Sequence, residues 1–142
     1  EFLLIDRDAV LAFAKECKDA GVSHFSLLSA VGSDSRSGFF YARTKGQLED
    51  GLRALKFERL SLFHPSMIIT PKNRYGWSQG LLLALMPIFN WFLLGPLKPI
   101  RGVRVEDLGR AMALDAVQTG PGEMILTWPD FQFMTKPSIG AL

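Results

Sequence analysis

Two periodicities alternate along the first 66 residues of the chain. Residues 6–21 predict a helix that Asp6 can cap, because apolar side chains recur there three or four positions apart. Residues 22–29 form a short apolar run bounded by polar residues, which predicts a buried strand. The pattern then repeats, with a helix expected over 38–55 and a strand over 57–65. The apolar stripe of the first helix consists of Val10, Phe13, Ala14 and Cys17.

This order of helix, strand, helix and strand, joined by short links, predicts a parallel sheet covered by helices and therefore an α/β fold. The link at 30–38 is rich in Gly, Ser and Asp, as is typical of a loop. Farther along, 67–70 either extends the sheet or forms a loop, and 100–105 is expected to be extended. Residues 122–134 predict a final strand, interrupted at Pro129. The helix expected before that strand carries Leu108, Met112 and Ala116 on one side.

An apolar run at 81–97 raises the question of a membrane. It lies at the short end of the roughly 17–25 residues that span a bilayer, and it contains Pro87 and Asn90. The favoured interpretation is a buried or ligand-covering pair of helices broken at Pro87. A membrane-surface or partner contact and a spanning helix are the alternatives, because a large exposed apolar patch marks an interaction site.

Composition narrows the class of protein. The 142 residues suffice for one domain, and a net charge of +2 from 16 basic and 14 acidic residues does not favour nucleic acid. The single cysteine excludes internal disulfides and suits a reducing compartment, and the two distant histidines form no metal-site spacing. The N-terminus is not a signal peptide, and it lacks methionine, as expected of a trimmed or incomplete chain.

Three residues carry candidate chemistry: Ser29, Tyr41 and Lys45. A lysine one helical turn from a tyrosine favours the phenolate and lowers its pKa from about 10, which makes the phenol usable in acid–base catalysis. Ser29 ends a predicted strand and Tyr41 opens the next helix, so both are expected at the sheet edge where α/β proteins bind ligands. The alternative is a tyrosine that packs through its ring beside a solvated lysine.

The segment "HFSLLSAVGSDSRSGFFYARTKGQLEDGL", together with "DRDAV" and "LGRAM", resembles the atypical or extended short-chain dehydrogenases/reductases. The closest resemblance is to the Tat-interacting oxidoreductase-like family. It implies that Tyr41 exchanges a proton with substrate, that Ser29 positions the substrate oxygen, and that Lys45 also holds the ribose of the nicotinamide cofactor, NADP. The family's Arg-Pro-Gly turn, which contacts the nicotinamide, reads His64-Pro65-Ser66 here, so this cofactor contact departs from the family pattern.

The Gly-rich dinucleotide fingerprint is absent from the 40 residues before Tyr41. The resemblance therefore implies the C-terminal part of a Rossmann-like doubly wound parallel sheet, with the first βαβ units absent. We expect one partial NAD(P)-binding-like domain, with 1–66 as the catalytic half of the sheet and 67–142 as a C-terminal substrate or cover region. The chain is then either part of a longer protein or a natural short form. An isolated half-sheet leaves an unpaired edge, so we expect marginal folding or association.

The function expected from these features is an NADP-linked oxidoreductase acting on a small carbonyl or hydroxyl compound. One alternative is a regulatory, partner-binding protein in transport, transcription or growth control that keeps the fold. A second alternative is a membrane-associated protein that uses residues 81–97. A cytoplasmic location is expected, with a nuclear or nuclear-envelope association also possible by resemblance.

Overall fold

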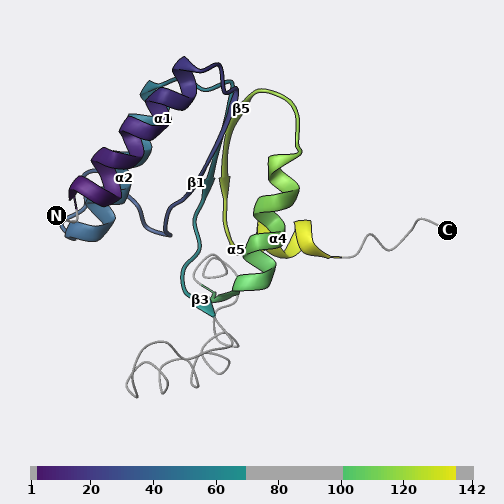
Figure 1. The fold of residues 1–142 in the computed structure, drawn as a ribbon. Helices are drawn as coiled ribbons and strands as arrows, with labels where there is room; N and C mark the ends of the chain where they lie inside the picture. The colour runs from purple at the N-terminus through teal and green to yellow at the C-terminus, as the bar shows by residue number, and fades with distance from the viewer. Residues whose placement is uncertain (1–2, 70–100, 137–142) are drawn as a thin grey trace.

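A computed structural model of the protein describes residues 3–69 and 101–136. Figure 1 shows two layers of helices on either side of a small central sheet. The sheet contains β1 (His24–Leu28), β2 (Arg59–Phe63) and β5 (Gly122–Leu126) in the order β1-β2-β5. Both pairings are parallel. The α/β fold with a parallel sheet is thus confirmed, and it has the arrangement of part of a Rossmann-like sheet.

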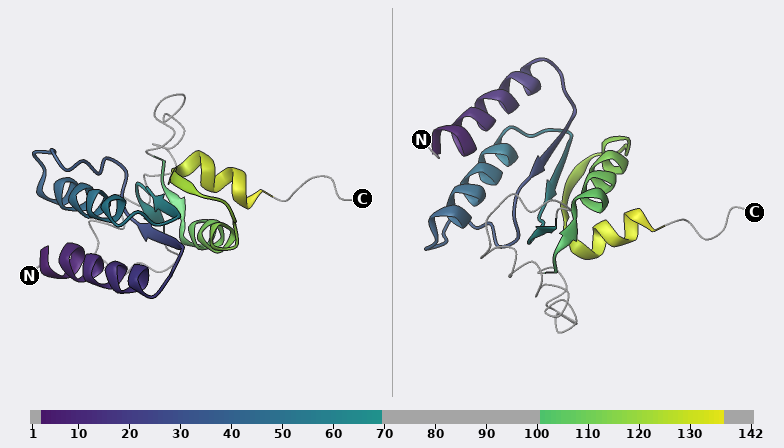
Figure 2. Two further views of the ribbon diagram at one scale, coloured as in Figure 1. Left: turned by 90° about the horizontal axis from the view of Figure 1, so that it is seen from above. Right: turned by 60° about the horizontal axis from the view of Figure 1, so that its bottom comes forward.

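The helices divide between the two faces of the sheet (Figure 2). The π-helical segment η1 (Leu4–Ala9) leads into α1 (Val10–Asp19), which packs beside α2 (Phe40–Ala54) on one face. Helices α4 (Val105–Ala116) and α5 (Trp128–Thr135) lie on the other face. Because side chains alternate along a strand, Leu60 and Leu62 of β2 pack beneath α1 and α2, whereas Phe63 packs beneath α4 and α5.

Two apolar cores result from this alternation. The core beneath α1 and α2 is formed by Ala14, Phe25, Leu27, Leu48, Leu52, Phe57, Leu60 and Leu62. The core beneath α4 and α5 is formed by Phe63, Val103, Leu108, Ala111, Leu126 and Phe131. The predicted helical stripe of 6–21 is confirmed only in part, since Ala14 is fully buried whereas Phe13 is 64% exposed.

The second half of the chain departs from its prediction at the last strand. Strand β5 ends at Leu126, and the residues after it form α5 rather than more strand. The Asp130 carboxylate accepts hydrogen bonds from the backbone N–H and the hydroxyl of Thr127, which caps the helix. Pro129 lies in the first turn, where a proline starts a helix instead of breaking a strand. Residues 122–134 were thus wrongly predicted beyond Leu126.

Two further expectations change in detail. Asp6 lies inside η1 rather than at a helix cap, so the predicted capping role is wrong. The segment 67–70 contributes a two-residue strand, β3 (Ile68–Ile69), which pairs in parallel with β4 (Val103–Arg104) as a separate small sheet.

The apolar run 81–97 lies outside the described residues. Among the helices of 3–69 and 101–136, none is long and apolar enough to span a bilayer.

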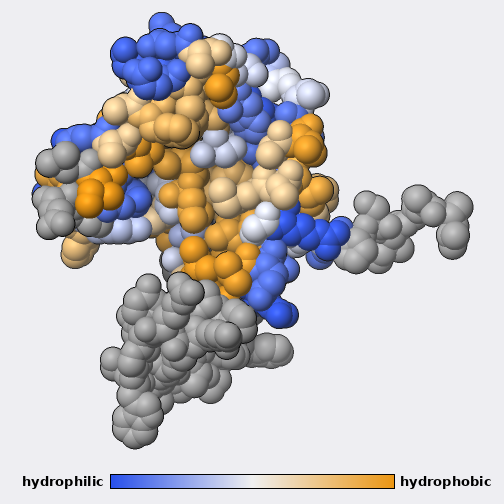
Figure 3. Space-filling model, in the orientation of Figure 1, coloured by the Kyte–Doolittle hydropathy of each residue, from blue (hydrophilic) through white to orange (hydrophobic). Residues whose placement is uncertain are grey.

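Strand β1 pairs only with β2 within the described part of the chain, so its other edge is unpaired there. Figure 3 shows apolar side chains gathered in the middle of one face, between the layer of α1 and α2 and helix α4. Val22 and Leu28, which flank and end β1, are both about two-fifths exposed at 39% and 40%. An open sheet edge of this kind is a template for pairing with further strands.

Candidate functional site

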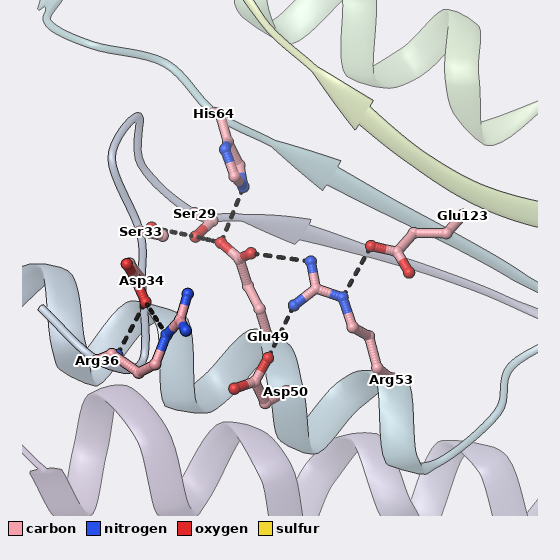
Figure 4. Close-up of polar contacts among 9 residues, drawn as sticks. All are labelled: Ser29, Ser33, Asp34, Arg36, Glu49, Asp50, Arg53, His64 and Glu123. Atoms are coloured by element: carbon pink, nitrogen blue, oxygen red, sulfur yellow. Dashed lines mark hydrogen bonds and ion pairs between the residues drawn. The ribbon is translucent and has the colours of Figure 1, made fainter.

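Ser29 lies directly after β1, at the carboxyl end of the strand, as predicted. Its backbone N–H donates to the carbonyl of Phe63 at 2.8 Å, which fixes the residue against the end of β2. The side chain is buried, with 6% of the residue exposed. Its hydroxyl donates to Oε1 of Glu49, and it lies 3.1 Å from the hydroxyl of Ser33 (Figure 4). The serine therefore faces the middle of α2.

Glu49 is the centre of this cluster, and 2% of it is exposed. Its Oε1 lies 2.8 Å from Nε2 of His64, and its Oε2 lies 3.3 Å from Nη2 of Arg53 (Figure 4). Burial by itself raises the pKa of Glu49, but its contacts with His64, Ser29 and Arg53 outweigh burial and hold that pKa below its usual value. The carboxylate is therefore ionised at neutral pH.

Arg53 joins the cluster to the third strand. Its Nη1 donates to Asp50 at 3.0 Å, and its Nε donates to Glu123 on β5 at 2.8 Å. One guanidinium thus contacts three carboxylates, and these contacts raise its pKa in spite of partial burial. A pocket of about 350 Å³ opens beside this cluster, lined in part by Ser33, Asp50, Arg53, His64 and Ile125.

The tyrosine and the lysine form a second group at the start of α2. The Lys45 ammonium lies 5.9 Å from the centre of the Tyr41 ring and 3.6 Å from a carboxylate oxygen of Asp6. Partial burial raises the pKa of Tyr41, and the negative charge of Asp6 raises it further. The expected lowering of this pKa is therefore wrong for this arrangement, because burial of the phenol, and next the charge of Asp6, outweigh the effect of Lys45.

Ser29 contacts a different part of α2 from the start of the helix, where Tyr41 lies. The serine contacts Glu49, which lies eight positions after Tyr41 on the same helix. Eight residues advance an α-helix by about 12 Å along its axis. The structure thus pairs Tyr41 with Lys45 and Ser29 with Glu49.

The turn His64-Pro65-Ser66 follows β2 as the resemblance implied. Its backbone is fixed on both sides, since His64 N–H donates to Leu126 at 2.7 Å and the Pro65 carbonyl accepts from Val31 at 3.0 Å. His64 is buried, and its ring is directed at Glu49 (Figure 4). Its Nε2 lies close to the carboxylate without a well-aligned hydrogen bond among the described residues.

The opposite end of the sheet carries a second polar cluster around Asp115, which is 1% exposed. Arg59 donates to it at 2.7 Å, and Nε2 of His24 lies 3.3 Å from it and 3.0 Å from the Ser61 hydroxyl. Burial by itself raises the pKa of Asp115, but Arg59, Ser61 and His24 together lower it. Because serine and carboxylate share one imidazole nitrogen, this group lacks the geometry of a catalytic triad. It joins α4 to β1 and β2.

Sequence reasoning missed Glu49 and Arg53. Their signal was present, because they lie four positions apart on a predicted helix, with Glu49 four positions after Lys45. A glutamate four positions from a lysine and an arginine on a helix is usually a solvated surface group. The burial of Glu49 becomes visible only when the structure places Ser29 against the middle of α2. No group of metal-ligating side chains is found in the described ranges 3–69 and 101–136.

Comparison with known proteins identifies relatives. Rat (Rattus norvegicus) protein HTATIP2 is 44% identical over 128 residues, which cover 88% of this chain and 50% of the relative. Mitochondrial protein FMP52 of Meyerozyma guilliermondii is 32% identical over 127 residues, or 88% of this chain and 55% of the relative. FMP52-1 of Scheffersomyces stipitis is 35% identical over 108 residues, covering 76% and 43%. The chain belongs to the family of HTATIP2 and FMP52.

This membership confirms the resemblance to the Tat-interacting oxidoreductase-like family that was inferred from the sequence. The chain spans about half the length of the curated relatives it matches. No family model matches the chain.

Proposed function

We propose that this chain supplies the catalytic side of an NADP-linked oxidoreductase of the short-chain dehydrogenase/reductase type. The observation that carries the proposal is the placement of Tyr41 and Lys45 one turn apart on a half-exposed helix start, in a chain of this family. The substrate proposed is a small carbonyl or hydroxyl compound. A bound nicotinamide would supply or accept the hydride, and the residues of this chain would manage the proton.

The acid–base role of Tyr41 follows from its surroundings. Because burial and Asp6 raise its pKa, the phenol keeps its proton at neutral pH. A protonated phenol can donate to a carbonyl oxygen that gains electrons, so this arrangement favours the general acid of a reduction. Removing the charge of Asp6 would leave Lys45 without that counter-ion and would make the phenol more acidic.

The residues expected to bind the cofactor are not all equally well placed to do so. Lys45 lies beside the Tyr41 ring, and its proposed role is to hold the ribose of the nicotinamide, as the family resemblance implies. The His64 ring is directed at Glu49 and also lines the pocket beside it, so a contact of His64 with the nicotinamide stays a prediction from the sequence. Tyr41 and Lys45 are therefore the residues that this proposal places at the nicotinamide end, and the contact expected of His64, Pro65 and Ser66 stays an untested prediction.

Turnover is the test of this proposal. Purified protein at its natural length is incubated with NADPH and a panel of small aldehydes and ketones, and absorbance at the NADPH band is followed. Tyr41→Phe is expected to lower the rate by roughly 10²–10⁴-fold, the usual worth of a positioned acid or base. Lys15→Met, which alters an exposed lysine of α1, is the control and should keep the rate. A Tyr41→Phe protein as active as wild type contradicts the proposal.

The location of the protein is a separate proposal. The fungal relatives are named mitochondrial, whereas the sequence alone favoured a cytoplasmic, nuclear or nuclear-envelope protein. We retain the cytoplasmic location as the proposal and take a mitochondrial one as its competitor. Fractionation of cells that express the tagged natural-length protein separates the two.

Partner binding in regulation becomes the better account if the protein shows no turnover and Tyr41→Phe leaves captured partners unchanged.

A further inference from the structure

The proton of the Ser29 hydroxyl is already committed in this structure. A hydroxyl carries one proton, and an ionised carboxylate can only accept. The contact between Ser29 and Glu49 therefore uses the serine proton. The Ser33 hydroxyl donates to the carbonyl of Ala30 at 2.7 Å, so its own proton is engaged as well. While Glu49 is ionised, Ser29 has lone pairs but no proton to offer a ligand.

The same carboxylate oxygen also faces His64. Oε1 of Glu49 receives the Ser29 proton and lies 2.8 Å from Nε2 of the imidazole. The two atoms are close, but their alignment is not that of a good hydrogen bond. An imidazolium would place a full positive charge at that distance, and this charge would draw electron density of Oε1 away from the serine.

We propose that Glu49 is a positioning residue that fixes the hydroxyl of Ser29, and that protonation of His64 loosens this hold. Neutral His64 leaves Ser29 as a hydrogen-bond acceptor, suited to a ligand hydroxyl. Protonated His64 competes for the shared oxygen, so that the serine proton becomes available to a ligand carbonyl. The inference concerns Ser29, to which the proposed function assigns no role, and it rests on the contacts of Glu49 and not on turnover.

Other charges around His64 change little over the pH range in which an imidazole titrates, about 5–8. Arg53 stays cationic because its pKa is raised, and Glu49 stays ionised because its pKa is held below its usual value. An arginine at position 64 would hold a permanent charge at the Glu49 oxygen, whereas histidine makes that charge depend on pH. The charged groups near His64 are Glu49, Asp50 and Arg53 on α2, Asp34 and Arg36 in the loop, and Glu123 on β5.

The test is NMR of the natural-length protein with ¹³C-labelled serine and histidine, recorded from pH 5 to pH 8. The ¹³Cβ resonance of Ser29 is expected to move with the same midpoint as the ring resonance of His64. The chain has only two histidines, so His24→Gln assigns the ring signals and should leave the Ser29 titration intact. In His64→Arg and Glu49→Gln the movement of the Ser29 resonance should be lost. His64→Gln replaces the arginine variant if that protein does not fold.

Three results would overturn the inference. The Ser29 resonance stays constant while His64 titrates, or it still moves in the His64 variants, or His64 does not titrate between pH 5 and 8. None of these readings uses cofactor or substrate. Loss of the Ser29 titration with normal NADPH turnover would therefore refute this inference alone, and an intact titration without turnover would refute only the proposed function.

Discussion

Gly46→Ala probes how the loop that carries Ser33 is seated on α2. A Cβ at position 46 would lie 2.1 Å from the backbone nitrogen of Ser35 and 2.3 Å from the carbonyl carbon of Asp34. Both are main-chain atoms, which cannot rotate away as a side chain can. The loop would have to move by about 1 Å or more before an ordinary separation of roughly 3.5 Å is reached.

The expected size of the effect follows from opposing contributions. Overpacking costs about 1–3 kcal/mol, and the displaced loop would weaken the hydrogen bond from Asp34 N–H to the Ala42 carbonyl, worth about 1 kcal/mol. Alanine has the higher helix propensity, so replacing a glycine inside a helix by alanine stabilises the folded state by about 1 kcal/mol. We therefore expect Gly46→Ala to lower the free energy of unfolding by about 1–3 kcal/mol.

Urea unfolding followed by circular dichroism measures this change. Gly109→Ala is the matched control, because Gly109 lies inside α4 and a Cβ there would meet nothing within 4 Å. The free energy of unfolding of that variant should rise by about 0.5–1 kcal/mol, from helix propensity alone. The reasoning fails if the two variants shift the unfolding midpoint in the same direction, since only close packing of the loop distinguishes them.

Three further predictions concern charged groups. Asp6→Asn should lower the pKa of Tyr41, read from the absorbance of the phenolate, and an unchanged pKa would refute the account of that tyrosine. Asp115→Asn leaves Arg59 buried without its counter-ion and should cost about 3–5 kcal/mol. Because the folded-state pKa of Asp115 is lowered, wild-type stability should fall as pH drops below about 4, with a shallower fall in the variant. Asp130→Ala removes the cap of α5 and should cost about 1 kcal/mol in the same urea assay.

The fold of the first 66 residues could be predicted from the sequence because each element there follows one period. The predicted helix at 38–55 and strand at 57–65 match α2 and β2 closely, since their apolar positions are the ones that fill the core. The end of β5 could not be predicted in this way. Its strand-forming residues run on into Trp128, and only the cap between Asp130 and Thr127 starts a helix there.

The site was less accessible to the same reasoning. Spacing alone placed Tyr41 beside Lys45, because four helical positions fix their distance. Spacing could not show that Tyr41 would be partly buried, or that Asp6, far away in the sequence, would lie beside Lys45, and these two features raise the tyrosine pKa. The hydrogen bond from Ser29 to Glu49 likewise joins distant positions of the chain. The loop that separates them packs closely against Gly46, which spacing alone does not show.

The central claim is that Tyr41 and Lys45 form the nicotinamide end of an oxidoreductase site, and NADPH binding tests it most directly. Fluorescence of NADPH is titrated with natural-length wild-type protein, Lys45→Met and the control Lys15→Met. The account predicts saturable binding that Lys45→Met weakens at least about tenfold, or roughly 1.4 kcal/mol, while the control binds as wild type does. Absence of binding at about 1 mM NADPH, or equal binding by all three proteins, would contradict it.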